Sequence, residues 1–413
     1  MFPIHDSLIT FFKLRELIIL RSNKAILIAY LCYIALGSFD GLLGVVWPEM
    51  SSKLGVPLEA LGVLAIVALV GFVLVSFNTG PLIRIRGLHT FLLISIVLRT
   101  IGFASFALFP SWSTVIIAIF ISALGAGGID AGLNIFIARR GTARQINWLH
   151  ACFGIGATLG PFLAAGVQAI GGSWEWNFGL IAVFMAGLSV LIWFTSSLWQ
   201  VDPSTDSKQT AESNQHAKLM QSLRLPVIWI STTLFFFYVG TELSAGQWSF
   251  TLFSLGRGIP ELAAKFWVGI YWGIFTVGRI LFGLIADKVR IKRVVRVALI
   301  TSSAGAVFLA WNPGGLGIAG LVLMGLAQAP IYPSLIATTV ARVGAEHAQN
   351  AIGFQGAAGG VGGTTMTSLI GLLAVSFGFE MIAVSVVILS LFTYLMFEIL
   401  LVITRKPEVG AVG

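Results

Sequence analysis

The chain has 413 residues, of which 57% are hydrophobic and only 10% are charged, and its formal net charge is +8. A soluble domain of this size carries roughly a quarter charged residues, so the composition excludes a soluble protein. The positive charge lies in segments that flank apolar runs and does not indicate a nucleic-acid partner.

Apolar runs recur from one end of the chain to the other, and each is long enough to cross a hydrocarbon core of about 30 Å as a helix. In lipid the backbone must satisfy its own hydrogen bonds, so each run is predicted to be helical. We therefore expect an all-α membrane protein with twelve transmembrane helices, near residues 26–48, 58–80, 90–109, 113–138, 149–171, 176–199, 226–254, 263–285, 294–311, 315–341, 350–375 and 379–403.

One polar segment, 200–225, interrupts this pattern and begins QVDPSTDSKQTAESNQ. It is rich in Ser, Gln, Asp and Lys and poor in side chains that pack, which is typical of a flexible linker. It predicts an N-terminal six-helix bundle (1–199) and a C-terminal six-helix bundle (226–413).

The distribution of Lys and Arg among the loops predicts the orientation in the membrane. With the N-terminus inside, almost every basic loop is cytoplasmic, whereas the outer loops hold only Lys53, Arg257 and Lys265. We expect a multi-pass protein of the plasma (inner) membrane with both termini cytoplasmic and the linker on the same side.

The segment GRILFGLIADKVRIKR (278–293), between predicted helices 8 and 9, resembles a loop motif of the major facilitator superfamily. Gly283, Asp287, Lys288 and Arg293 match that motif. The resemblance implies a secondary transporter, not an enzyme, that works mostly as a monomer, with these four residues latching the two halves in one conformational state. Arg279, which precedes the motif, is grouped with the same latch.

Three carboxylates lie well inside predicted spans, away from the helix ends: Asp40 in helix 1, Asp130 in helix 4 and Glu242 in helix 7. A charged side chain at a helix centre costs roughly 2.5–3.5 kcal/mol on insertion scales, so each should face the bundle interior or water. Burial favours the neutral form of a carboxyl group, so each could take up and release a proton. The alternative is a hydrogen-bond anchor between helices that stays protonated.

Further polar and aromatic side chains share the faces or helices of these acids. Asn134 lies one turn after Asp130, and Asn147 and His150 open helix 5. His150 could titrate with the acids or simply lie at the interface. Pro330 and Pro333 are expected to break helix 10. The candidate solute-binding residues are Asp40, Asn134, Asn147, Glu242, Gln247, Trp248, Gln328, Tyr332 and Gln355, and the candidate proton-coupling residues are Asp130, Glu242, Asp40 and His150. Each aromatic could equally be a packing residue.

The segments GSFDGLLGVVWPEM, GIDAGLNIFIAR, QINWLHACFGIG, FYVGTELSAGQW and GLAQAPIYPSL together resemble the fucose–galactose–glucose/proton symporter branch of that superfamily. The resemblance covers nearly the whole chain. It implies that the helix-1 acid, here Asp40, contacts sugar and that the helix-4 acid, here Asp130, carries the proton. Animal members of the branch couple to sodium.

The expected function is proton-coupled uptake of a sugar or similar small polar metabolite by alternating access. Two alternatives are a sodium-coupled sugar symporter and a proton-coupled antiporter that exports a drug or metabolite. The stretch GIGATLGPFLAAG (154–166) loosely resembles an antiporter motif, although its glycine spacing also permits tight packing. A receptor or scaffold without transport is a further alternative. No metal, no cofactor, no nucleotide-binding loop and no hydrolase motif is expected.

Overall fold

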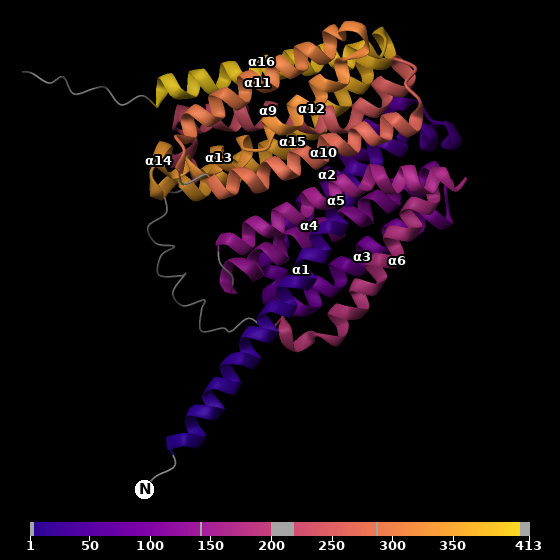
Figure 1. Cartoon of the computed structure of the whole chain (residues 1–413). Coiled ribbons are helices and arrows are strands. Elements are labelled where there is room, and N and C mark those ends of the chain that lie inside the picture. Colours follow the sequence, from indigo (N-terminus) through magenta and orange to yellow (C-terminus); the bar gives the residue numbers. More distant parts are fainter. Residues whose placement is uncertain (1–3, 141–142, 200–218, 286–287, 405–413) are drawn as a thin grey trace, which may run out of the picture. The chain divides into compact units, whose positions relative to one another are not determined.

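The computed structural model describes residues 4–140, 143–199, 219–285 and 288–404. Within these ranges the secondary structure is helical and contains no strand, which confirms the all-α prediction (Figure 1). Twelve helical stretches in the described residues are long and apolar enough to cross a membrane, the number expected from the sequence.

The first half of the chain forms six long helices and two short ones. Their bounds are α1 Ile4–Leu54, η1 Leu58–Ala60, α2 Leu61–Arg86, α3 Leu88–Leu108, α4 Trp112–Arg140, α5 Ala143–Ala169, α6 Trp174–Phe194 and η2 Ser196–Leu198. The apolar span of α1 runs from Lys24 to Leu54, so it covers the predicted first helix and extends it at both ends.

The second half begins with the short helix α8, Leu219–Leu223, and continues through six spans. Its elements are α9 Pro226–Thr251, the π-helix η5 Leu252–Gly256, α10 Glu261–Ile285, α11 Ile291–Trp311, η7 Pro313–Gly315, α12 Gly317–Gln328, α13 Ile331–Ala337, α14 Thr339–Val343, α15 Ala345–Phe377 and α16 Glu380–Ile403. The predicted break in helix 10 lies at Ala329 and Pro330, between α12 and α13.

Contacts between Cα atoms divide the chain into two compact units. One comprises the described parts of 1–39, 70–156 and 172–205, and the other those of 40–69, 157–171 and 206–413. This division cuts across α1, α2 and α5, whereas the sequence divides the chain at the polar linker. The linker residues 200–218 lie outside the described part, so the two-bundle boundaries stay a prediction.

Each unit has its own helix packing. In the first, α3 packs against α4 and α6, and Phe103, Phe106 and Phe178 stack in its core. In the second, α9 packs against α15 and α16, α11 against α12 and α16, and α10 against α12. These contacts give α9 and α10 buried faces, on which the polar side chains of one candidate site lie.

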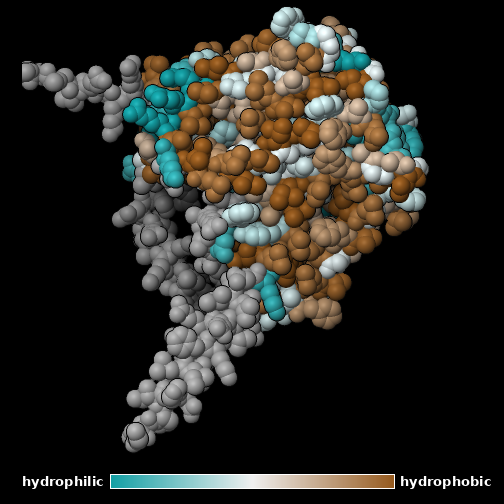
Figure 2. Space-filling view, in the orientation of Figure 1, coloured by the Kyte–Doolittle hydropathy of each residue, from teal (hydrophilic) through white to brown (hydrophobic). Residues whose placement is uncertain are grey.

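Apolar side chains cover much of the face of the molecule seen in Figure 2, and hydrophilic ones gather toward its edges. Large apolar side chains such as Phe194, Ile170 and Val183 are mostly exposed. A water-facing surface rarely presents contiguous apolar area on this scale, whereas a lipid-facing one requires it.

Candidate functional site

Asp130 lies near the middle of α4, where its carboxylate accepts hydrogen bonds from two helices. The Tyr33 hydroxyl on α1 donates to Asp130 Oδ1 at 2.7 Å. Asn134 Nδ2, one turn further along α4, donates to the Tyr33 oxygen at 2.6 Å and to Asp130 Oδ1 at 3.3 Å. The three side chains form a closed hydrogen-bonded set, so the carboxylate is held in one orientation although it lies within a span.

His150 on α5 borders this set. Its ring meets the Tyr33 ring edge-on, with centroids 5.7 Å apart, and it interacts electrostatically with Asp130. The imidazole is solvent-exposed, so it can exchange protons with water. The predicted partner Asn147 also lies on α5, but its side chain is outside the described part. The structure therefore brings Asp130, Asn134 and His150 together around Tyr33.

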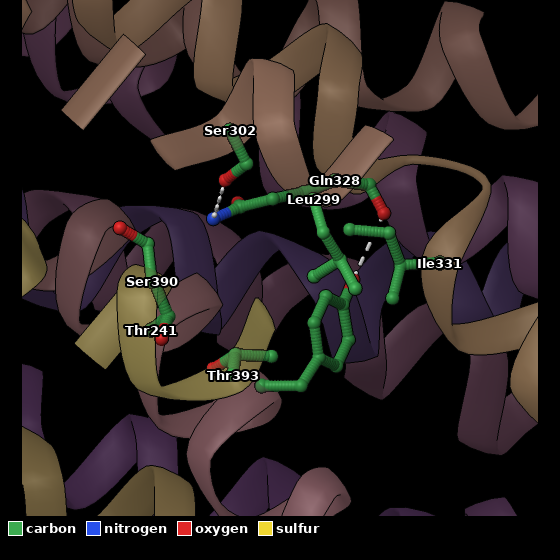
Figure 3. A pocket seen from close by; sticks show the side chains of 8 residues that line it. Thr241, Leu299, Ser302, Gln328, Ile331, Ser390 and Thr393 are labelled. Atoms are coloured by element: carbon green, nitrogen blue, oxygen red, sulfur yellow. Dashed lines mark hydrogen bonds between the residues drawn. The ribbon is translucent and has the colours of Figure 1, made fainter. Parts of the chain in front are cut away.

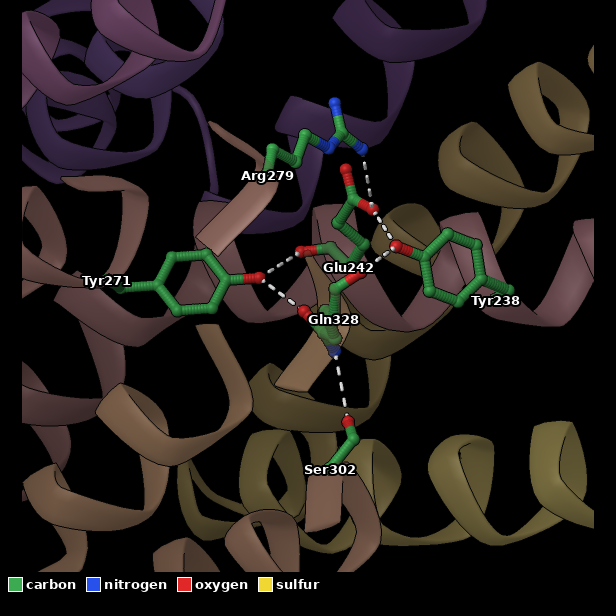
Figure 4. Close-up of polar contacts among 6 residues, drawn as sticks. All are labelled: Tyr238, Glu242, Tyr271, Arg279, Ser302 and Gln328. Carbon is green, nitrogen blue, oxygen red and sulfur yellow. Dashed lines mark hydrogen bonds and ion pairs between the residues drawn. The ribbon is translucent and has the colours of Figure 1, made fainter. Parts of the chain in front are cut away.

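Glu242 forms the centre of a second polar cluster, on α9 and α10 (Figure 4). The Tyr238 hydroxyl, one turn earlier on α9, donates to Glu242 Oε2 at 2.5 Å. Arg279 Nη2 on α10 lies 3.8 Å from the same oxygen. Arg279, which the sequence groups with the loop motif, is thus an ion-pair partner of an acid within the membrane.

Gln328 closes this cluster from the end of α12. Its Oε1 accepts a hydrogen bond from the Tyr271 hydroxyl at 2.8 Å, and its backbone oxygen accepts one from Tyr238 at 2.9 Å. That oxygen is available to a side chain because α12 stops at this residue. Tyr332 follows the break; its ring packs edge-on against Phe235, and its centroid lies 6.5 Å from that of Tyr238.

A small cavity adjoins Tyr238 and Gln328 (Figure 3). It measures about 10 Å³ as seen by the centre of a water molecule, and Thr241, Ser302, Ser390 and Thr393 are among its lining residues. A site of this size holds a single water at most. A sugar does not fit in this cavity.

Asp40 and Gln247 are also brought together. Gln247 Nε2 on α9 donates to the backbone oxygen of Asp40 on α1 at 2.8 Å. Gln247 Oε1 is buried and has no hydrogen-bond partner among the described residues. This amide oxygen can therefore accept a hydrogen bond from another donor.

Two other predicted contact residues lie in the protein interior. Trp248 is 1% exposed and its indole nitrogen donates to the Thr367 backbone oxygen on α15. Gln355 is fully buried, and its Oε1 accepts a hydrogen bond from Thr339. Trp248 therefore has the surroundings of a packing residue, whereas Gln355 Nε2 is buried and has no hydrogen-bond partner among the described residues.

The loop motif is only partly described. Gly283 lies near the end of α10, Lys288 follows it and Arg293 lies in the first turn of α11, all solvent-exposed. Asp287 lies outside the described residues, so the predicted latch stays a prediction.

Four residues of the two clusters were not among the solute-binding or proton-coupling residues predicted from the sequence: Tyr33, Tyr238, Tyr271 and Arg279. Tyr33 had a usable signal, because it lies seven residues before Asp40 and so shares a face of helix 1. Tyr271 and Arg279 lie on a helix that offers no carboxylate of its own near them, and only its packing against α9 and α12 places them here.

Comparison with known proteins gives one family. The family model described as Major Facilitator Superfamily matches residues 29–315 and, in an overlapping second match, 254–412. Sodium-dependent glucose transporter 1 of Homo sapiens is 24% identical over 344 residues, 73% of this chain, and the chain spans 64% of that protein's length.

Two solved structures share the fold. The E. coli fucose:proton symporter has a TM-score of 0.64 at 15% identity, over 93% of this chain and 99% of that one. A D-xylose-proton symporter has a TM-score of 0.68 at 16% identity, over 89% and 96%. Together with the family match and the twelve apolar helices in the described residues, these likenesses confirm the resemblance seen in the sequence: this multi-pass membrane protein belongs to the Major Facilitator Superfamily of transporters.

Proposed function

We propose that the protein is a proton-coupled secondary transporter that takes up a sugar or similar small polar metabolite. Like other secondary transporters, it would expose its solute site alternately to the two sides of the membrane. We further propose that it works as a monomer in the plasma (inner) membrane, with both termini cytoplasmic as the Lys and Arg distribution favours.

The observation that carries this proposal is the environment of Asp130. A carboxylate held by Tyr33 and Asn134 beside an exposed histidine has both a fixed geometry and a route for protons. A residue that only joined helices would need no contact with a titratable, solvent-exposed neighbour. The two solved relatives are a fucose:proton symporter and a D-xylose-proton symporter, and this supports the same assignment.

Solute-induced proton movement tests the proposal directly. A panel of hexoses, pentoses and sugar acids is first screened for binding through the fluorescence of the 12 tryptophans. A solute that binds is then added to a lightly buffered suspension of cells that express the protein. We expect the medium to become more alkaline as proton and solute enter together.

Two other outcomes identify the alternatives. Acidification of the medium on addition of solute would show proton antiport and overturn uptake by symport. Uptake that needs sodium and moves no proton would show sodium coupling. The similarity to the human sodium-dependent glucose transporter 1 supports this alternative.

Tyr33→Phe is expected to slow proton-driven uptake about 10- to 100-fold, because it removes a hydroxyl bonded to a group that carries charge. The Asp130 and Asn134 contacts at 2.7 and 2.6 Å would both be lost. Initial uptake rates in vesicles with an imposed pH gradient measure the effect. The control is Tyr30→Phe, one turn earlier on α1, which removes a hydroxyl that donates to the Gln145 backbone oxygen at 3.3 Å. Equal rates for the two variants would exclude a coupling role for Tyr33.

A further inference from the structure

The guanidinium of Arg279 has fewer acceptors than it can use. Its Nη2 lies 3.8 Å from Glu242 Oε2, close enough for charge attraction but beyond hydrogen-bond distance. Its Nε is buried and has no hydrogen-bond partner among the described residues. The Phe275 ring centroid lies 4.2 Å from Arg279 Cζ, and the ring offers no hydrogen-bond acceptor to the guanidinium N–H groups. A planar donor edge is therefore only partly used.

The hydrogen bond from Tyr238 keeps the Glu242 carboxylate from pairing closely with Arg279. Tyr238 holds Oε2 at 2.5 Å, and Figure 4 shows the second carboxyl oxygen pointing away from Tyr238. Tyr271 donates to the Glu242 backbone oxygen at 3.1 Å and to Gln328, which fixes this part of α9. The side chains of Arg279 and Glu242 remain 20% and 12% exposed, so the cluster is not completely closed.

An unpaired buried donor is unfavourable, and a charged one is more so. Such a cost is explained if an acceptor arrives during the transport cycle. A carboxylate accepts two parallel hydrogen bonds from a guanidinium and also neutralises its charge. A sugar hydroxyl can accept a hydrogen bond from the guanidinium but leaves its charge unbalanced. When Glu242 is protonated, Arg279 has no counter-charge in the cluster, and its need for an anion is greatest.

Resting on the proposed function, we infer that the transported solute is a sugar acid, that Arg279 binds its carboxylate, and that Glu242 competes with the solute for the same guanidinium. Protonation of Glu242 releases Arg279 to the solute. Loss of that proton returns Glu242 to Arg279 and expels the solute.

The groups that face Glu242 are Tyr238 on its own helix, Tyr271 and Arg279 on α10, and, beyond Tyr238, Tyr332 on α13. Other described acids and bases on elements packed against α9 have partners outside this cluster. Glu346 lies beside His347, Glu380 pairs with Arg257, and Lys265 lies near Glu261. Glu398 pairs with Arg296 beside Tyr394, and Arg342 donates to the Leu335 backbone oxygen. Competition for Arg279 is therefore expected to depend on the protonation of Glu242.

Equilibrium binding to the purified full-length protein, without a proton gradient, tests the inference. The probes are matched pairs that differ only in a carboxylate or hydroxymethyl group at carbon 6: galacturonate with galactose, and glucuronate with glucose. At about pH 6 we expect one acid to bind at least tenfold more tightly than its hexose. Arg279→Gln should lower the affinity for the acid at least tenfold and remove the preference. The matched control is Arg296→Gln, which removes a guanidinium paired with Glu398 on an exposed face and should leave the preference unchanged.

Glu242→Gln supplies the second arm, since it mimics the protonated acid and cannot pair ionically with Arg279. Affinity of the wild-type protein for the acid should fall at least fivefold between about pH 6 and pH 8, whereas that of Glu242→Gln should stay constant. Equal binding of acid and hexose, failure of both acids to bind, or an unchanged preference in Arg279→Gln would overturn the inference. If a neutral hexose causes proton uptake, the inference that the solute is a sugar acid is overturned, but the proposed function is not.

Discussion

Asp130→Asn is expected to abolish accumulation of solute against its gradient while exchange of solute across the membrane continues. The amide has the same shape as the carboxylate, and its oxygen can still accept from the Tyr33 hydroxyl. The hydrogen-bonded set around Tyr33 and Asn134 is therefore retained, and the protein should fold and bind solute. What the amide cannot do is carry a proton.

The expected size of this effect follows from the driving force. One proton moving inward through about 100 mV supplies roughly 2.3 kcal/mol, which supports a gradient of about 50-fold at one-to-one coupling. In Asp130→Asn the steady-state ratio of inner to outer solute should fall to about one. Counterflow of labelled solute in preloaded vesicles should persist, because exchange needs no net proton movement.

A matched acid on another helix controls for the loss of a carboxylate within the membrane. Glu398 on α16 pairs with Arg296 at 2.6 Å and belongs to neither polar cluster, so Glu398→Gln should accumulate solute normally. Normal uphill transport by Asp130→Asn would remove this residue from the coupling step and leave Glu242 as the candidate. Loss of both accumulation and counterflow would show that Asp130 serves binding or folding instead.

The helices and the acids could be predicted because each leaves a local signal. A run of about 20 apolar residues is visible without any tertiary information, and a carboxylate inside such a run is conspicuous. The pairing of Asp130 with Asn134 and of Tyr238 with Glu242 follows from the spacing of four residues along a helix. The break in helix 10 follows from Pro330 and Pro333.

The partners of the acids could not be predicted in the same way, because they come from other helices. Tyr33 reaches Asp130 only because α1 lies beside α4, and Arg279 reaches Glu242 only because α10 packs against α9. An arginine next to a loop motif is most simply assigned to that motif. Nearness in sequence can also mislead. Trp248 lies six residues after Glu242, but its indole faces α15.

Gly156→Val is expected to destabilise the protein severely, because α1 and α5 are in backbone contact at this position. A Cβ atom at Gly156 would overlap the Ile34 carbonyl oxygen, and the nearby Ser38 backbone leaves it no space. Overpacking by side chains alone costs typically 1–3 kcal/mol, and displacing a helix backbone costs more. We expect at least about 3 kcal/mol, measured as a large fall in the temperature of unfolding by tryptophan fluorescence in detergent.

The control lies ten residues further along the same helix. A Cβ atom at Gly166 would meet nothing within 4 Å, so Gly166→Val should change the unfolding temperature little. Both glycines belong to GIGATLGPFLAAG, the stretch that resembles an antiporter motif. If only Gly156→Val unfolds the protein, the first part of that stretch serves helix packing, and its presence gives no support to proton-driven export. If Gly156→Val folds normally but reverses the direction of solute-coupled proton movement, the motif sets the direction of coupling as well as the helix packing.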